Sequence, residues 1–420
     1  MALAFAKVGF DVTGIDIDLR KVGQLSNGLS YSAEVSSADV RAMGQASRFR
    51  ATADFSALAD RDTILLCVPI TLDAARIPNR QALERAIESI QTQLKPGQMV
   101  VSCSDGIGET QDLIRVCLER SGLSATVDFD LIYMSPRIDP GRLDFTIANT
   151  PLVIGGVTQR AIERGMRLVN GLGVSVHPIS SPSSAEMSKL LEGAFRAVNI
   201  ALVNELAPLC ERMGLDIWEI INAATGKPFG FMPFSPGAGV GGQFIPVQTE
   251  LLAAKAREHN LHLPLIETAI HINLSMASHA VHLLEHALSQ VHVALRGAKV
   301  IVVGVAYKRD TEDIHDAPAR RIIEMLIKQG VQVSYHDPYV PRLEIGGTAT
   351  LAKKRSLVSV ALDESTLELT HGVIIVTGHH AVDYANLVRH ARAVVDCVNA
   401  TEGVKTKGAT IIRLGVGGNK

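Results

Sequence analysis

The feature that most constrains the fold of this chain is a change of hydrophobic period along its length. From Val12 to about residue 180, short β-branched runs alternate with longer runs whose apolar residues recur at helical spacing. Strands are predicted at 11–18, 62–70, 97–104 and 152–156, and helices at 37–46 and 79–94. Such alternation is typical of βαβ units with a parallel sheet. We therefore expect a doubly wound α/β domain over residues 1–182.

The β pattern disappears in the middle of the chain and then returns. Residues 185–214 and 267–291 carry apolar side chains at helical spacing, whereas the stretch between them, 226–246, is too rich in Gly and Pro for a helix. A second α/β alternation begins at residue 298, with strands predicted at 298–308, 331–339, 372–378 and 391–397 and a helix at 318–330. The predicted fold is α/β: two Rossmann-like doubly wound domains, 1–182 and 296–420, joined by a helical segment, 183–295, with a long central helix.

Charge and hydropathy exclude several classes of function. The net charge is −2 with acids and bases interspersed, which argues against a nucleic-acid partner. No apolar run reaches the roughly 18 residues that a membrane span needs. The N-terminus lacks the pattern of a secretory signal, so we expect a cytoplasmic protein.

Metal binding is not expected from the sequence. Five scattered cysteines form no C-x-x-C pair, which argues against a disulfide framework and against structural zinc. His279, His282 and His286 share one predicted helix face with Glu285. We interpret them as a polar helix surface, since a zinc site requires a converging fourth ligand.

Three long motifs resemble one known family. Residues 186–214 (EMSKLLEGAFRAVNIALVNELAPLCERMG), 227–242 (KPFGFMPFSPGAGVGG) and 304–319 (GVAYKRDTEDIHDAPA, followed by YHDPYVP) resemble the UDP-glucose/GDP-mannose dehydrogenases, in particular those acting on UDP-N-acetylhexosamines. The resemblance covers nearly the whole chain. It implies NAD on the first domain, a UDP-sugar between the middle and last domains, a homodimer through the long central helix, and a four-electron oxidation of the sugar C6.

The family's reaction proceeds through a covalent bond to a thiol, and this chain departs from the family at the catalytic positions. In G-G-Q-F-I-P-V-Q-T, Phe244 stands where the family has its nucleophilic cysteine and Gln248 where it has an aspartate. Gly193 replaces the asparagine of the K-L-L-E-N helix. The segment 135–141 is one residue shorter than the family's S-P-E-R-V-D-P-G and lacks its glutamate.

Two catalytic positions are retained. Lys189 matches the lysine that stabilises the developing oxyanion, and Ser104 keeps the hydroxyl of the family's threonine. Lysine on a helix is more commonly solvated, so both interpretations of Lys189 stay open.

The cofactor motif is incomplete in this sequence. Residues 1–10 match the helix that follows the glycine-rich loop, so the first strand and the G-x-G-x-x-G are not in the sequence. Asp16 matches the ribose-binding carboxylate, or it simply ends a strand. Since the first strand is central in this fold, its absence predicts a gap or a rearranged pairing. A start assigned too late and a lost strand are alternative explanations.

The positions that would contact the nucleotide sugar are better retained. They are Phe229, Gly230, Phe231, Gly237, Gly241, Gly242 and Lys308. However, His315 and Val398 stand where the family has arginines, which predicts a weaker diphosphate contact because neither supplies a bidentate donor.

Three hypotheses follow for function. The first is a non-catalytic or regulatory relative that keeps the fold, holds a nucleotide sugar weakly and does not carry out the four-electron oxidation; NAD is expected only from the resemblance. The second is a repurposed enzyme that uses Lys189 and Ser104 for other chemistry on a related substrate. The third is an NAD-dependent UDP-sugar dehydrogenase with a misassigned start.

Overall fold

The computed structural model describes residues 1–32, 35–137, 144–405 and 408–418, and the chain forms two compact units. The N-terminal unit consists of Met1–Leu72 and Pro78–Leu191, and the C-terminal unit of Asp73–Ile77 and Glu192–Lys420. The boundary between them falls within the long helix α7 (Pro182–Met213). The predicted fold class, Rossmann-like sheets with a helical middle region, is confirmed.

The N-terminal unit contains most of the short strands. In chain order its elements are α1 (Ala2–Lys7), β1 (Val12–Ile15), α2 (Leu19–Ser26), α3 (Ser37–Gln45), β2 (Phe49–Thr52), the 3-10 helix η1 (Phe55–Asp60), β3 (Thr63–Leu66), β4 (Thr71–Leu72), β5 (Pro78–Asn79), α4 (Gln81–Gln93), β6 (Met99–Ser102), the π-helix η2 (Glu109–Arg115), α5 (Val116–Glu119), β7 (Asp130–Ser135), β8 (Leu152–Gly156), α6 (Gln159–Asn170) and β9 (Val176–Ile179).

The main sheet of this unit has five strands in the order β3-β6-β7-β8-β9. Its pairs are parallel except β7 with β8, which run antiparallel, so the predicted all-parallel sheet is wrong at this pair. The described part of the β7–β8 connection contains no helix. An antiparallel pair needs no helical crossover, which explains the change of direction.

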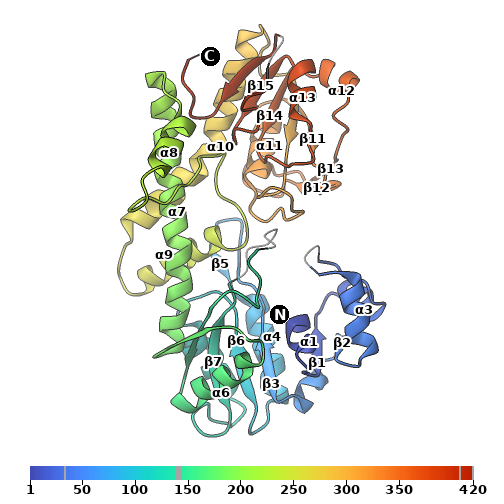
Figure 1. Ribbon diagram of the computed structural model, residues 1–420, viewed down its shortest axis with the longest axis vertical. Coiled ribbons are helices and arrows are strands. Elements are labelled where there is room, and N and C mark those ends of the chain that lie inside the picture. The colour runs from blue at the N-terminus through green and yellow to red at the C-terminus, as the bar shows by residue number, and fades with distance from the viewer. Residues whose placement is uncertain (33–34, 138–143, 406–407, 419–420) are drawn as a thin grey trace. The chain divides into compact units, whose positions relative to one another are not determined.

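The strands β1 and β2 form a separate two-stranded parallel sheet, visible in blue beside the main sheet in Figure 1. Among the described residues no strand pairs with both β1 and β3, and we call this discontinuity the sheet break. An ion pair of 3.1 Å joins Asp11, just before β1, to Arg61, just before β3. Of the two outcomes expected for a sheet without its first strand, the structure shows the gap and not a rearranged pairing.

The C-terminal unit holds the helical middle region and the second sheet. Its elements after α7 are α8 (Ile217–Thr225), α9 (Ile245–Glu258), α10 (Pro264–Gln290), β10 (Lys299–Val303), α11 (Pro318–Lys328), β11 (Gln332–His336), β12 (Arg342–Ile345), β13 (Arg355–Val358), α12 (Glu364–Glu368), β14 (Gly372–Ile375), α13 (Tyr384–His390), β15 (Ala393–Asp396) and β16 (Thr410–Arg413).

The sheet of the C-terminal unit is fully parallel, in the order β11-β10-β14-β15-β16. Alternate residues of β10 point to opposite faces. Val300 and Val302 pack with α10 and α11, whereas Ile301 and Val303 pack with α12 and α13. The sheet is therefore covered by helices on both faces.

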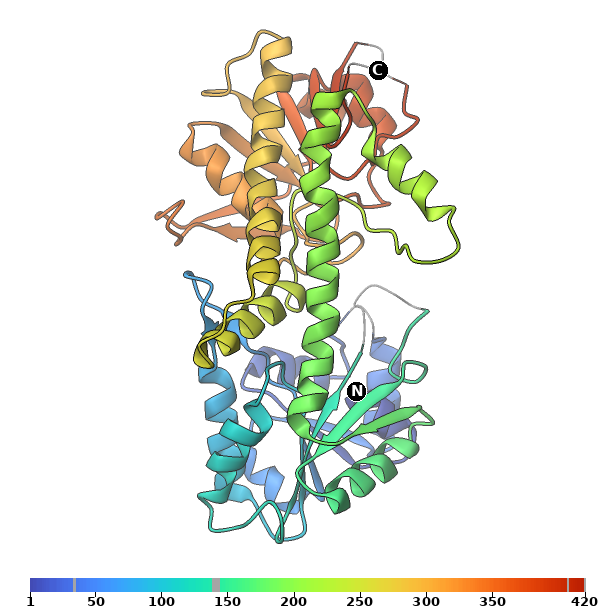
Figure 2. The same cartoon turned by 90° about the vertical axis from the view of Figure 1, so that its left-hand side faces the viewer.

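The helices α7 and α10 run side by side, as Figure 2 shows. A buried hydrogen bond of 2.9 Å joins Asn204 of α7 to Asn273 of α10. Within the described ranges, no helix is both long and apolar enough to cross a membrane.

Candidate functional site

Lys189 is almost fully buried and forms an ion pair in the N-terminal unit. Its Nζ lies 2.9 Å from Oδ1 of Asp105, and the two side chains are 10% and 14% exposed. Asp105 belongs to the turn that follows β6. Lys189 is thus not a solvated surface lysine, and its charge is balanced by an aspartate that the sequence analysis did not single out.

Ser104 is also engaged within the protein. It is buried, and its hydroxyl donates a hydrogen bond of 2.6 Å to the carbonyl oxygen of Val68. The retained hydroxyl therefore joins the turn after β6 to the turn after β3.

A buried carboxylate, Glu186, lies one helical turn before Lys189 on α7. It accepts hydrogen bonds from the backbone N–H of Gly108 (2.6 Å), and from the N–H (2.9 Å) and hydroxyl (2.6 Å) of Thr110. Burial raises the pKa of Glu186 to about 7, against these hydrogen bonds, which favour the charged form. Sequence pattern gave no signal for this residue, since a glutamate in a long helix is usually solvated.

Asp16 follows β1 and is used in a local turn. Its Oδ1 accepts a hydrogen bond of 2.8 Å from the N–H of Asp18, and Lys21 lies 3.6 Å from its other oxygen. The described residues around it supply a carboxylate suited to a ribose. The helix that precedes β1 in the described residues is α1, with Met1 at its N-cap and no side-chain hydrogen bond to that cap.

In the C-terminal unit, the substituted catalytic positions 193 and 248 touch each other. Phe244 lies just before α9, and its carbonyl oxygen accepts a hydrogen bond of 2.8 Å from the N–H of Gln248. The Gln248 side chain is buried and packs against Gly193 of α7. A Cβ at position 193 would overlap the Gln248 amide and would lie 3.1 Å from its Cβ. Gly193 thus provides the space that Gln248 fills.

The glycine-rich loop before α9 is held by specific contacts. The N–H of Gly237 donates to Oδ1 of Asn204 (2.9 Å), and the N–H of Gly242 donates to the carbonyl oxygen of His315 (2.7 Å). A Cβ on Gly241 or Gly242 would come within 2.8 Å of the Tyr307 side chain. These glycines therefore allow the loop to lie against the turn that follows β10.

The remaining predicted ligand residues lie in the same unit. Phe229 and Phe231 are exposed on the loop, separated by Gly230 at φ +68°, and Nζ of Lys227 lies 5.0 Å from the centre of the Phe229 ring. Lys308 is partly buried in the turn after β10, where its carbonyl accepts a hydrogen bond from Thr311.

The two positions with replaced arginines differ in character. The ring of His315 lies 2.5 Å from Asp313, and this hydrogen bond raises the pKa of His315. Val398 is partly buried after β15 and offers no charge. Of the segment 135–141, residues 138–141 lie outside the described residues.

One of the three histidines predicted to share a helix face, His279 of α10, forms a contact with a carboxylate of another helix. Nε2 of His279 lies 3.0 Å from Oε1 of Glu211 on α7. This contact joins α10 to α7.

Comparison with family models matches all three parts of the chain to the UDP-glucose/GDP-mannose dehydrogenase family. The NAD binding domain matches residues 1–172, the central domain residues 183–275 and the UDP binding domain residues 301–403.

Individual relatives agree with these matches. The chain is 30% identical to UDP-N-acetyl-D-mannosamine dehydrogenase of Pyrococcus horikoshii, over 81% of this chain and 80% of that protein. It is 31% identical to UDP-N-acetyl-D-glucosamine 6-dehydrogenase of Pseudomonas aeruginosa, over 78% of each. The solved structure of UDP-D-ManNAc dehydrogenase from P. horikoshii superposes with a TM-score of 0.88 at 27% identity, covering 99% of this chain and 96% of that one.

Proposed function

Because the chain belongs to the UDP-glucose/GDP-mannose dehydrogenase family, we propose that it binds a UDP-sugar but does not carry out the NAD-dependent four-electron oxidation of the sugar C6. The contact between Gly193 and Gln248, which lies one helical turn after Phe244, carries the proposal. It supports a site that has been repacked with other side chains, because the space for an asparagine at 193 is filled by the amide at 248.

The chemistry of the substituted side chains supports the same conclusion. The second oxidation removes a hydride from a carbon that is bonded to a thiol, and the phenyl ring of Phe244 cannot form that bond. A carboxamide at 248 cannot accept a proton as a carboxylate does. Lys189 is already paired with Asp105, and the Ser104 hydroxyl with a backbone carbonyl.

Binding of a UDP-sugar is supported by the C-terminal unit. The turn formed by Gly241 and Gly242 is supported by Tyr307 and His315, and Lys308 follows the first strand of the sheet. His315 and Val398 in place of arginines predict an affinity lower than an arginine pair would give. The hydrogen bond to Asp313 raises the pKa of His315, but the imidazole has no planar fork of donors with which to bind an anion as a guanidinium does.

Weak NAD binding is part of the proposal. The chain contains the family's NAD-binding domain, and Asp16 lies at the end of β1. The Asp16 carboxylate, which would hold a ribose, accepts a hydrogen bond from the N–H of Asp18 and lies 3.6 Å from Lys21, so it is engaged within the protein.

A homodimer is proposed from the exposed face of α7. From residue 195 to the end of the helix, large apolar side chains recur at spacings of three, four or seven residues, and each is 38–61% exposed: Phe195, Leu202, Leu206, Leu209 and Met213. A stripe of this kind is typical of a helix that packs on another helix.

Titration calorimetry with UDP, UDP-N-acetylglucosamine and NAD, together with NADH fluorescence, tests the proposed function. We expect heat from the uridine ligands, little or none from NAD, and no NADH. The variant Phe244→Cys should also form no NADH, because it keeps Gly193 and Gln248 in place of the family's asparagine and aspartate. NADH formation from a UDP-sugar by the unmodified protein would overturn the proposal, and a different product found by mass spectrometry would favour a repurposed enzyme.

A further inference from the structure

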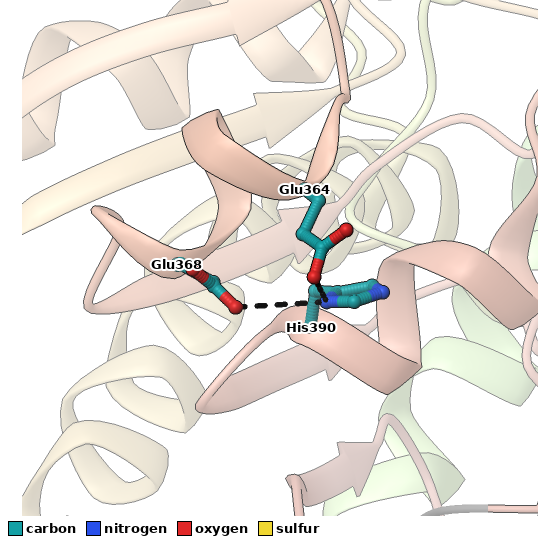
Figure 3. Close-up of side chains that lie close together, drawn as sticks. All are labelled: Glu364, Glu368 and His390. Atoms are coloured by element: carbon teal, nitrogen blue, oxygen red, sulfur yellow. Dashed lines mark ion pairs between the residues drawn. The ribbon is translucent and has the colours of Figure 1, made fainter.

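The helices α12 and α13, which cover the second face of the C-terminal sheet, bring three metal-binding side chains together. Glu364 and Glu368 lie one turn apart on α12, and His390 is the last residue of α13. Figure 3 shows both carboxylates directed at the His390 ring. None of the three has a role in the proposed sugar-nucleotide function.

The distances between the ligand atoms distinguish this group from an ordinary hydrogen-bonded pair. Nδ1 of His390 lies 3.6 Å from an oxygen of Glu364 and 3.9 Å from an oxygen of Glu368. An N–H···O hydrogen bond needs about 2.7–3.2 Å, so neither carboxylate forms one with the ring. Two ligands of a tetrahedral zinc ion with bonds of about 2.1 Å lie about 3.4 Å apart. The two distances from His390 are near this value, and all three ligand atoms lie within 4.8 Å of one another.

The supporting backbone is fixed while the carboxylates can adjust. Leu367 of α12 and Leu387 and Val388 of α13 are fully buried against the sheet. The side chain of His390 is only 17% exposed, whereas those of Glu364 and Glu368 are 68% and 62% exposed. Small rotations of two solvated side chains therefore suffice to bring their oxygens to the bonding distance from one ion, while the imidazole is held in place.

We propose that Glu364, Glu368 and His390 form a binding site for one Zn²⁺ ion. One neutral imidazole and two carboxylates are ligands that zinc accepts, and the two negative charges balance the ion. Water completes the tetrahedron on the exposed side. The bound ion joins α12 to α13 and stabilises the face of the sheet that these helices cover.

Calorimetric titration of ZnSO₄ into the full-length, untagged protein, previously stripped with EDTA, tests this proposal. We expect one saturable equivalent of Zn²⁺ and a rise in Tm that EDTA reverses, since an ion that binds only the folded state stabilises it. His390→Gln, and separately Glu368→Gln, should abolish both effects. Both variants should keep the far-UV circular dichroism of the parent, because the exchanged groups are polar.

A matched control is His262→Gln. Nδ1 of His262 lies 3.8 Å from a single carboxylate, that of Glu267, so this pair has the spacing of the proposed site without its third ligand. Zn²⁺ binding should be unchanged in this variant. Absence of binding in the parent, or an equal loss in His262→Gln and His390→Gln, would overturn the site. UDP-sugar titration of the same variants keeps this result distinct from a failure of the proposed function.

Discussion

The side-chain amide of Gln248 fills the space above the Cα of Gly193, so a side chain at 193 and the present one at 248 exclude each other. Two positions that differ from the family pattern are thus one structural change. Restoring one position alone should damage the protein instead of improving it.

Gly193→Asn is expected to destabilise the fold by about 1–3 kcal/mol, because the new Cβ overlaps a buried amide. Gly193→Asn combined with Gln248→Asp should recover at least about 1 kcal/mol of that loss, since the shorter side chain frees the space. Urea unfolding of both variants measures the coupling.

Gly44→Asn is the control for this pair. Gly44 is also a helical glycine, on α3, but a Cβ there would meet nothing within 4 Å. Its free energy of unfolding should change by less than about 0.5 kcal/mol. Equal losses for Gly44→Asn and Gly193→Asn would show that helix propensity, not the Gln248 contact, is responsible.

Lys189→Met should cost about 3 kcal/mol of folding free energy, because it removes the cation paired with a largely buried Asp105. Adding Asp105→Asn should reduce that loss. The exposed pair of Lys7 and Asp39 offers a comparison, and Lys7→Met should cost less than about 1 kcal/mol. If Lys189→Met is as mild as Lys7→Met, the ion pair is not structural and Lys189 is better regarded as an available cation.

Glu186 should make stability depend on pH. Its pKa is about 7 in the folded protein against 4.5 for a free glutamate, so between these values the folded state binds more protons than the unfolded state. Stability should therefore fall as pH rises from 4.5 to 7, by roughly 3 kcal/mol, and change little from this group above 7.

The test for Glu186 is thermal unfolding across this pH window. Glu186→Gln should flatten the profile, because glutamine carries no titrating proton. Glu88→Gln, at an exposed position of α4, should leave the profile as it is. A profile that keeps its slope in Glu186→Gln would assign the proton uptake to another group.

Leu202→Glu together with Leu209→Glu is expected to convert a dimer into a monomer, since charges would be placed within the apolar stripe of α7. Light scattering after size-exclusion chromatography reports the mass. Leu369→Glu is the control. It makes the same exchange at a residue outside α7 that is 69% exposed, and it should leave the mass unaltered. A parent protein that is monomeric at micromolar concentration would contradict the proposed homodimer.

Periodic segments of the fold were predictable from sequence. The helix expected at 267–291 is α10, and the strand expected at 372–378 contains β14. These segments have a strong local signal, since their apolar spacing follows the helix or strand period over many residues. The antiparallel pairing of β7 and β8 has no such signal, because strand direction is decided by the connection and the neighbouring strands.

The candidate site was predictable only as a set of positions. Motif matching found Lys189, Gly193 and Gln248. It did not find that Asp105 pairs with Lys189, or that positions 193 and 248 contact each other. Asp105 reaches Lys189, and Gln248 reaches Gly193, from segments distant in the sequence. Such contacts depend on tertiary packing. The hydrophobic period and the spacing of residues in the sequence carry no information about it.

The sheet break also has a consequence for association between molecules and for hydrogen exchange of the backbone amides. Val12 and Asp16 donate hydrogen bonds toward β2, so by strand alternation the amides of Thr13 and Ile15 are directed away from it. In the part of the chain that the structure describes, no strand pairs with this edge of β1. An unpaired edge is a template for an added strand and promotes association between molecules. The amide protons of β1 are expected to exchange with deuterium in two classes, slow at Val12 and fast at Thr13, which makes this edge a place where the fold opens or recruits a further strand.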